Sequence, residues 1–237
     1  MVAAMTSRLR LVMDTVRDGK AALLALRLIV AVIGVAAWFG TQALIGRRPL
    51  ISSGIGDGMH LLLAPLNHYL ILHSKAANGL LIMSSGLVDI LAVFILLEWL
   101  FGRSVRPLLG LGIVLALRQV MQGLCALPIP QNMIWHYPGF PSLLVTYGVA
   151  NDFFFSAHTA ITVFAATELA RLGRGWLKGL AVLCVVFEAT TVLILRIHYT
   201  MDVFTAIITA LYVAHITEKI SPGLDQRLAR AFPPTSK

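Results

Sequence analysis

The chain has 237 residues, of which 58% are hydrophobic and 13% are charged, and its mean hydropathy is +0.83. Soluble domains are about half apolar and about a quarter charged, so this composition excludes a soluble globular protein and a disordered one. The net charge of +8 does not indicate nucleic-acid binding, because the basic residues lie in short clusters between apolar stretches, as in membrane proteins.

The apolar stretches predict an all-α membrane bundle of six transmembrane helices, since each is close to the ~20 residues that cross a ~30 Å hydrocarbon core. In chain order, the predicted spans are residues 22–46, 79–101, 107–127, 153–172, 177–197 and 200–218. They form one membrane domain, 22–218, which follows a basic amphipathic segment, 1–21, and precedes a short basic tail, 219–237. We expect the N-terminal segment to form an amphipathic helix that lies along an anionic membrane surface.

Two connections between the predicted spans are longer than simple turns. Residues 51–78 are moderately apolar and contain three histidines, and we expect an interfacial or re-entrant helix there. Residues 128–152 are rich in proline and glycine, which predicts an irregular loop. Both connections fall on the same side of a six-span bundle.

Lysine and arginine are distributed unevenly between the two sides of this bundle. With the N-terminus inside, only Arg47, Arg48 and Lys75 fall in outer segments. The inner segments carry thirteen: Arg8, Arg10, Arg17, Lys20, Arg103, Arg106, Arg171, Arg174, Lys178, Lys219, Arg227, Arg230 and Lys237. Because basic residues accumulate on the cytoplasmic side, we expect both termini in the cytoplasm and the loops around 47–78, 128–152 and 198–200 on the outer, periplasmic or lumenal, side.

Ionisable residues within the spans are the candidates for chemistry, because a membrane bundle rarely buries them without a function. His158 lies near the outer end of the fourth span, and His198 and Asp202 lie at the turn between the fifth and sixth spans. The i, i+4 spacing places the carboxylate beside the imidazole, where it holds one ring nitrogen and leaves the other as a nucleophile. Ser156 marks a helix start that can receive an anion. The alternative is a pair of structural histidines bonded to neighbouring helices.

Two segments around these residues resemble the catalytic motifs of a known enzyme family. NDFFFSAHT (151–159) and RIHYTMDVFTAIITALY (196–212) resemble the paired motifs of the sphingomyelin synthase branch of the type 2 phosphatidic acid phosphatase superfamily. LRQVMQGLCALPIP (117–130) and FPSLLVTYGVANDFFFSAH (140–158) look closer still to plant phosphatidylcholine:diacylglycerol cholinephosphotransferases. The resemblance covers roughly residues 110–215 and implies a type 2 phosphatidic acid phosphatase-like core.

The resemblance also implies a role for each member of the site. His198 would take the phospho-headgroup as a phosphohistidine, Asp202 would orient it, and His158 would protonate the departing lipid alcohol and then activate the acceptor. Ala157 stands where the first motif has glycine, and the superfamily's lysine-x6-arginine-proline phosphate clamp is absent. The transferase branch lacks this clamp too, so its absence counts against a simple phosphatase.

Two cations remain to neutralise a phosphate. Arg196, two residues before His198, is our first choice, and Arg118 in the third span is the second. Arg118 has a structural alternative, an ion-pair network with acidic residues of other spans: Asp89, Glu168 and Glu188.

Aromatic residues fill the outer loop between residues 128 and 155, which has no lysine or arginine. Trp135 and Tyr137, with Asp152 nearby, suit a quaternary ammonium group through cation–π attraction. The alternative is the aromatic belt that any membrane protein carries at the interface.

These observations predict a membrane phosphotransferase that moves a phospho-headgroup, first of all phosphocholine, from a phospholipid to diacylglycerol or a similar lipid alcohol. We expect no metal and no cofactor, because arginine and imidazolium supply the positive charge. The alternatives are a lipid phosphate phosphatase that uses the same residues, and a non-catalytic lipid transporter or scaffold. The expected partners are the lipid substrates and the membrane, without nucleic acid; a homo-oligomer is left open.

Overall fold

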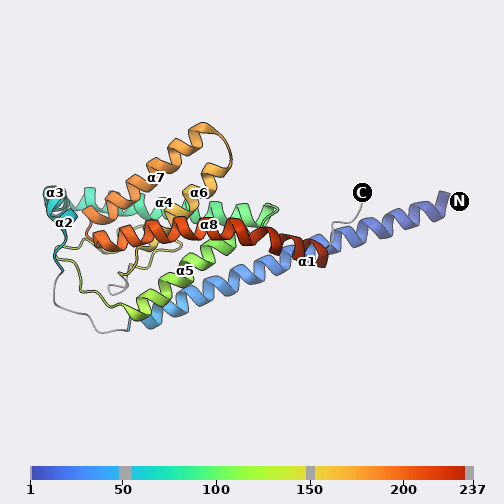
Figure 1. Ribbon diagram of the computed structural model, residues 1–237, viewed down its shortest axis with the longest axis horizontal. Coiled ribbons are helices and arrows are strands. Elements are labelled where there is room, and N and C mark those ends of the chain that lie inside the picture. The colour runs from blue at the N-terminus through green and yellow to red at the C-terminus, as the bar shows by residue number, and fades with distance from the viewer. Residues whose placement is uncertain (1, 48–54, 148–152, 233–237) are drawn as a thin grey trace.

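The computed structural model describes residues 2–47, 55–147 and 153–232, and within these ranges it contains eight α-helices and no strand (Figure 1). The predicted all-α class is therefore confirmed. The helices are α1 (Val2–Ile45), α2 (Gly58–Leu62), α3 (Ala64–Leu72), α4 (Ser74–Phe101), α5 (Arg106–Leu124), α6 (Ala157–Arg171), α7 (Gly175–Ile194) and α8 (Thr200–Ala231).

Five of the described helices are long and apolar enough to cross a membrane: α4, α5, α7, α8 and the Gly19–Leu44 part of α1. The fourth predicted span, 153–172, corresponds to α6, which has only 15 residues because it begins at Ala157 rather than at Phe153. At 1.5 Å per residue α6 is about 22 Å long, shorter than a ~30 Å hydrocarbon core. By length and composition, five of the six predicted spans can cross a membrane, and the fourth, α6, is too short on this criterion.

The helices at the two ends of the chain are longer than the predicted elements. α1 is one uninterrupted helix that extends far beyond the rest of the bundle, so the basic N-terminal segment continues directly into the first apolar stretch (Figure 1). α8 continues past residue 218 to Ala231 and contains Pro222, so most of the predicted tail is also helical. The placement of both segments relative to a membrane stays a prediction.

α6 lies at the centre of the bundle and packs against α4, α7 and α8. Every residue from Ala157 to Ala166 is buried. Helices in membranes approach closely where their residues are small, and α5 does so at Gly110, where an added Cβ atom would lie 2.0 Å from Cζ of Phe164. Phe164 on α6 is completely buried, so this crossing fixes α6 against α5.

The segment predicted as one interfacial or re-entrant helix, 51–78, contains two short helices and the first turn of α4. α2 and α3 lie at one end of the bundle, where α7 ends (Figure 1). The predicted outer loop is irregular over the residues that the structure describes, from Cys125 to Tyr147. Loops at this end of the bundle surround the predicted catalytic residues.

Candidate active site

His158 lies at the N-terminus of α6, as the second residue of the helix. A span that begins at residue 153 would place His158 about one and a half turns inside the helix. This prediction is wrong, because residues 153–156 precede the helix. Ser156 is the N-cap, and its hydroxyl accepts a hydrogen bond from the Thr159 amide at 3.2 Å. The Ser156 amide in turn donates to the Asp202 carbonyl at 3.4 Å, which ties the start of α6 to the start of α8.

His198 lies in the turn between α7 and α8, two residues before α8 begins, so it does not share a helix with Asp202. Asp202 is the third residue of α8, and its Oδ2 atom accepts a hydrogen bond from the Tyr199 amide at 2.8 Å. This capping box turns the carboxylate back over the turn. Nδ1 of His198 therefore lies 3.6 Å from Oδ2 of Asp202, and the Asp202 side chain is completely buried. The two groups meet through a helix cap, whereas the sequence argument assumed one helical face.

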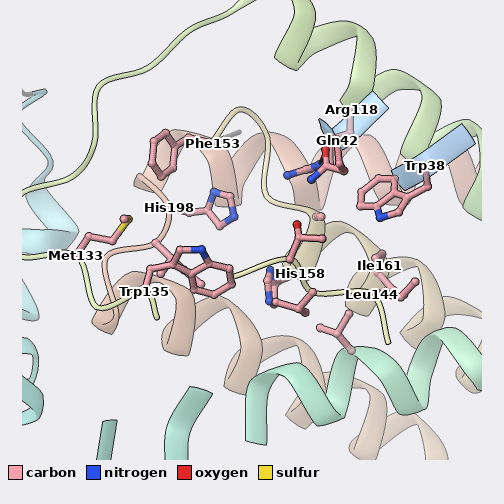
Figure 2. Close-up of a pocket in the computed structure, with 15 residues that line it drawn as sticks. Trp38, Gln42, Arg118, Met133, Trp135, Leu144, Phe153, His158, Ile161 and His198 are labelled. Atoms are coloured by element: carbon pink, nitrogen blue, oxygen red, sulfur yellow. Dashed lines mark hydrogen bonds between the residues drawn. The ribbon is translucent and has the colours of Figure 1, made fainter. Parts of the chain in front are cut away.

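The two imidazoles face one cavity. Their ring centroids lie 6.4 Å apart with the ring planes at 61° (Figure 2). The cavity has a volume of about 50 Å³, and α1, α4, α5, α6 and the segments 133–146 and 197–198 contribute to its wall. Asp202 lies behind His198 rather than in the cavity wall, as expected for a group that orients a ring.

Of the two cations predicted for the phosphate, only Arg118 lines this cavity. Its Nε atom donates to the Phe155 carbonyl at 2.9 Å, its Nη1 atom to Oε1 of Gln42 at 3.5 Å, and its guanidinium lies 5.4 Å from the Trp38 ring centre. Arg118 is 2% exposed. The structure thus places a buried guanidinium beside the two imidazoles.

Arg196, our first choice from the sequence, has a different environment. Its backbone is left-handed, with φ of +54°, and its guanidinium donates to the carbonyls of Gln131 at 3.0 Å and His60 at 2.9 Å. It does not line the cavity. These bonds join the turn that carries His198 to the loop after α5 and to α2, so the observed contacts of Arg196 are structural.

The acidic residues predicted as alternative partners of Arg118 have other partners. Asp89 accepts hydrogen bonds from Ser142 and from the amides of 143 and 144 at 2.8–3.0 Å. Glu168 forms an ion pair with Arg106 at 2.5 Å, and Glu188 accepts from Ser84 at 2.6 Å. Asp89 therefore anchors the loop over the cavity, while Glu168 and Glu188 each join two helices. In the part of the chain that the structure describes, no group of three or more His, Cys, Asp or Glu side chains has the arrangement of a metal site.

The aromatic loop residues divide into two groups. The Trp135 ring lines the cavity, with its centroid 5.9 Å from that of His158 at 81°, and Phe153 meets His198 at 6.4 Å and 84° (Figure 2). Tyr137 is 60% exposed, and its ring contacts Tyr147 rather than the cavity. Asp152, the predicted carboxylate of this loop, lies outside the described residues.

Two groups of residues near the site escaped the sequence analysis. Trp38 and Gln42, from α1, line the cavity. A glutamine in an apolar helix is the signal that could have revealed this contact, because buried polar side chains need partners.

The second group is in α2. Asp57 caps α2, and its two carboxylate oxygens also accept the Thr200 hydroxyl and amide, each at 2.6 Å. His60 donates from Nε2 to the His198 carbonyl at 2.8 Å and stacks on Tyr199 at 5.5 Å. Burial raises the pKa of Asp57, but the hydrogen bonds from Thr200 and from the His60 amide outweigh it and hold this pKa below its ordinary value. α2 therefore clamps the turn that carries His198.

A protein-family model described as AtPDCT1/2 matches residues 57–219, which is more than half of the chain and includes every residue of the cavity wall except Trp38 and Gln42. No curated protein and no solved structure matches the chain.

Proposed function

Because the chain belongs to the AtPDCT1/2 family, the phosphatidylcholine:diacylglycerol cholinephosphotransferases, we propose that it transfers phosphocholine from phosphatidylcholine to diacylglycerol. One observation carries the proposal: His158 and His198 face one cavity with their rings 6.4 Å apart, and the buried Asp202 carboxylate lies behind His198. Such a set supplies a nucleophile, an orienting carboxylate and a proton carrier. The separation leaves space for a phosphoryl group between the rings.

In the first step, Nε2 of His198 attacks the phosphorus of phosphatidylcholine. The bond between phosphorus and the glycerol oxygen breaks, and His158 gives its proton to that oxygen, so that diacylglycerol leaves. Phosphocholine stays on His198 as a phosphohistidine. In the second step, a new diacylglycerol gives its hydroxyl proton to His158, and its oxygen attacks phosphorus and releases His198. The two steps balance without water or a cofactor.

Asp202 supports the charge that appears on His198. With Nδ1 of the ring 3.6 Å from its Oδ2 atom, the carboxylate favours the orientation in which Nε2 faces the substrate. A buried carboxylate also stabilises the imidazolium form of the phosphorylated ring, because the low-polarity surroundings strengthen the attraction.

Arg118 and the N-terminus of α6 neutralise the phosphate. Arg118 lines the cavity, and so do Ala157 and His158, the first two residues of α6, where the helix dipole favours an anion. Ala157 keeps this approach open because its side chain is a single methyl group. Ser156 contributes as the cap of the helix.

Aromatic rings hold the choline. Trp38, Trp135 and Phe153 line the cavity, and a quaternary ammonium group is attracted to such ring faces. The cavity of about 50 Å³ is far smaller than the roughly 300–1,000 Å³ of ordinary ligand pockets, so the segment 133–146 has to move outward to admit a headgroup. Its closure afterwards excludes water from the phosphohistidine.

For the membrane arrangement, α6 is the sixth crossing. Because α6 is shorter than the hydrocarbon core, residues 153–156 complete the crossing on the side of the cavity, and His158 at the N-terminus of α6 lies below the headgroups. The distribution of lysine and arginine supports an arrangement with both termini in the cytoplasm and the cavity on the outer side.

The test is to incubate the purified full-length protein with phosphatidylcholine labelled in the choline and to titrate unlabelled diacylglycerol of a different chain length. The label should move to the new phosphatidylcholine species, and free phosphocholine should be negligible at saturating diacylglycerol. A persistently high proportion of free phosphocholine would identify a hydrolase. If all of the label stays on the original phosphatidylcholine, both activities are excluded.

A matched pair of loop variants sharpens this test. Trp135→Ala opens the cavity wall and should raise the ratio of free phosphocholine to transferred label. Tyr137→Ala, in the same loop but outside the wall, should leave that ratio near the wild-type value. Equal ratios in both variants would contradict the role of the loop in excluding water.

A further inference from the structure

An apolar groove of about 770 Å³ lies between α1, α5 and the C-terminal part of α8, away from the two imidazoles. Val30 and Gly34 of α1, Gly112 and Ala116 of α5 and Leu228 of α8 are among its lining residues. α1 contributes one wall although its apolar segment is only 6% buried. The groove is therefore open on its side to the surrounding bilayer.

The groove lies one helical turn from the catalytic cavity along one face of α1. Gly34, Trp38 and Gln42 are spaced four residues apart, so they lie on the same side of the helix. Gly34 lines the groove, whereas Trp38 and Gln42 line the cavity. Figure 2 shows these two side chains of α1 next to Arg118 of α5. The same two helices thus border both spaces.

The two ends of the groove differ in polarity. At the far end, Arg27 donates to the Leu100 carbonyl at 2.5 Å and lies 5.8 Å from the Trp99 ring centre, and Arg227 is exposed. On α1 the lining residues run from Leu23 to Gly34, eleven residues or about 16 Å along the helix. This is close to the ~15 Å depth of one leaflet's hydrocarbon, half of a ~30 Å core. The groove therefore has the length of an acyl chain.

We propose that this groove binds one acyl chain of the diacylglycerol moiety that the donor and the acceptor share. The glycerol end lies at Gln42 and Arg118, and the chain lies beside Gly34 and Gly112. The inference rests on the proposed function, because that function places a glycerolipid at the cavity. The groove lies next to the cavity on both helices, Gly34 beside Trp38 on α1 and Ala116 beside Arg118 on α5. This position favours a lipid bound at the cavity over a second copy of the chain, which would block lateral access to the site.

Glycine-to-leucine variants fill the groove without disturbing the packing. A Cβ atom at Gly34 or Gly112 meets no atom within 4 Å, so a leucine at either position extends into open space. Gly40→Leu is the matched control: it is on the same helix, its Cβ also meets no atom within 4 Å, and it lines neither space.

The first readout is the specificity constant for dioleoyl and dihexanoyl substrates in mixed micelles. In Gly34→Leu and Gly112→Leu, the ratio of the long-chain to the short-chain constant should fall about tenfold, the effect of one or a few misplaced methylene groups. In Gly40→Leu the ratio should equal that of the wild type. An unchanged ratio in both groove variants would overturn the inference while leaving the transferase activity in place.

The second readout does not depend on turnover. Phosphatidylcholine with a photoreactive group at the end of one acyl chain should label residues 23–34 of α1 and 108–116 of α5, less in Gly34→Leu and undiminished in Gly40→Leu. Label spread equally over the exposed face of α7, or α1 crosslinked to a second copy, would overturn the inference. A protein labelled in the groove that transfers no phosphocholine would retain the acyl-chain site and refute the proposed function.

Discussion

α6 and α1 contribute to the same cavity but are held in the bundle in opposite ways. α6 has 15 residues, is buried from Ala157 to Ala166 and packs against α4, α7 and α8. α1 has 44 residues, its apolar segment is 6% buried, and its main neighbour is α5. His158 comes from the first helix, and Trp38 and Gln42 come from the second.

This difference separates two requirements of a lipid enzyme. Proton transfer and attack at phosphorus need groups fixed to a fraction of an ångström, which packed helices and capped turns provide. A lipid substrate has to enter sideways from the bilayer, which a loosely packed helix permits. We therefore expect substitutions on the α6–α8 side to abolish the chemistry, and substitutions on the α1 side to change which lipids are used.

The largest effect is expected at the turn before α8. His198→Ala should reduce transfer to background because its role is covalent, and Asp202→Asn should lower kcat strongly with little change in KM, as for an interaction made mainly in the transition state. Steady-state kinetics of purified variants, with thermal unfolding as the control for folding, measure both. Near-normal kcat in folded Asp202→Asn would contradict its orienting role.

Arg118 should come next. Arg118→Ala should lower kcat by roughly 10²–10³, the cost of losing one preorganised charge at a developing anion, and should weaken inhibition by free phosphocholine. Arg118→Lys keeps the charge but loses the fork that binds Phe155 and Gln42, so it should recover part of the loss. If phosphocholine inhibits Arg118→Ala as well as it inhibits the wild type, Arg118 is structural.

The packed side of the comparison can be tested at two neighbouring glycines of α5. Gly110→Ala should destabilise the protein by about 1–3 kcal/mol, because its Cβ overlaps the buried Phe164 ring. Gly112→Ala, whose Cβ meets no atom within 4 Å, should be neutral or slightly stabilising. Thermal unfolding in a fixed detergent compares the two, and equal unfolding temperatures would contradict the close α5–α6 crossing.

The smallest effect is expected at the α2 clamp. Asp57→Asn should lower kcat a few-fold, because Asn retains only part of the bonding to Thr200. Hydrogen bonds hold the Asp57 pKa below its ordinary 3.8 in spite of burial, so its stabilising contribution is complete above that value and is lost as the pH falls through the lower folded pKa. Wild-type stability should therefore decline below about pH 4 more steeply than that of Asp57→Asn. If the stabilities of the wild type and of Asp57→Asn decline equally as the pH falls, the proposed role of Asp57 in holding the turn is refuted.

The sequence predicted the relative positions of the candidate catalytic residues better than it predicted their surroundings. His198 and Asp202 lie four residues apart at a turn, so local spacing was enough to bring them together, although a helix cap rather than a helix face joins them. For His158 the helix start was misplaced by four residues, because an apolar run of phenylalanines reads as helix even where the backbone is irregular.

The choice between the two arginines depended on contacts that are distant in the chain. Arg196 is adjacent to His198 in sequence, but its left-handed backbone and its bonds to Gln131 and His60 direct its guanidinium elsewhere. Arg118 was placed about 13 Å below the end of a span, nine residues at 1.5 Å each. α5 in fact ends at Leu124, six residues after Arg118, so the guanidinium reaches the cavity. Apart from the polar residue Gln42 itself, nothing in the sequence of α1 indicates that this helix lines the cavity.

The central claim is that His198 carries phosphocholine during the reaction. The direct measurement is to incubate the protein with phosphatidylcholine labelled in the phosphate, without an acceptor, quench in base and map the label by peptide mass spectrometry. We predict an acid-labile, base-stable label on His198 that disappears when diacylglycerol is added and is absent in His198→Ala. Transfer that proceeds without such a label, or with the label on another residue, would contradict the account.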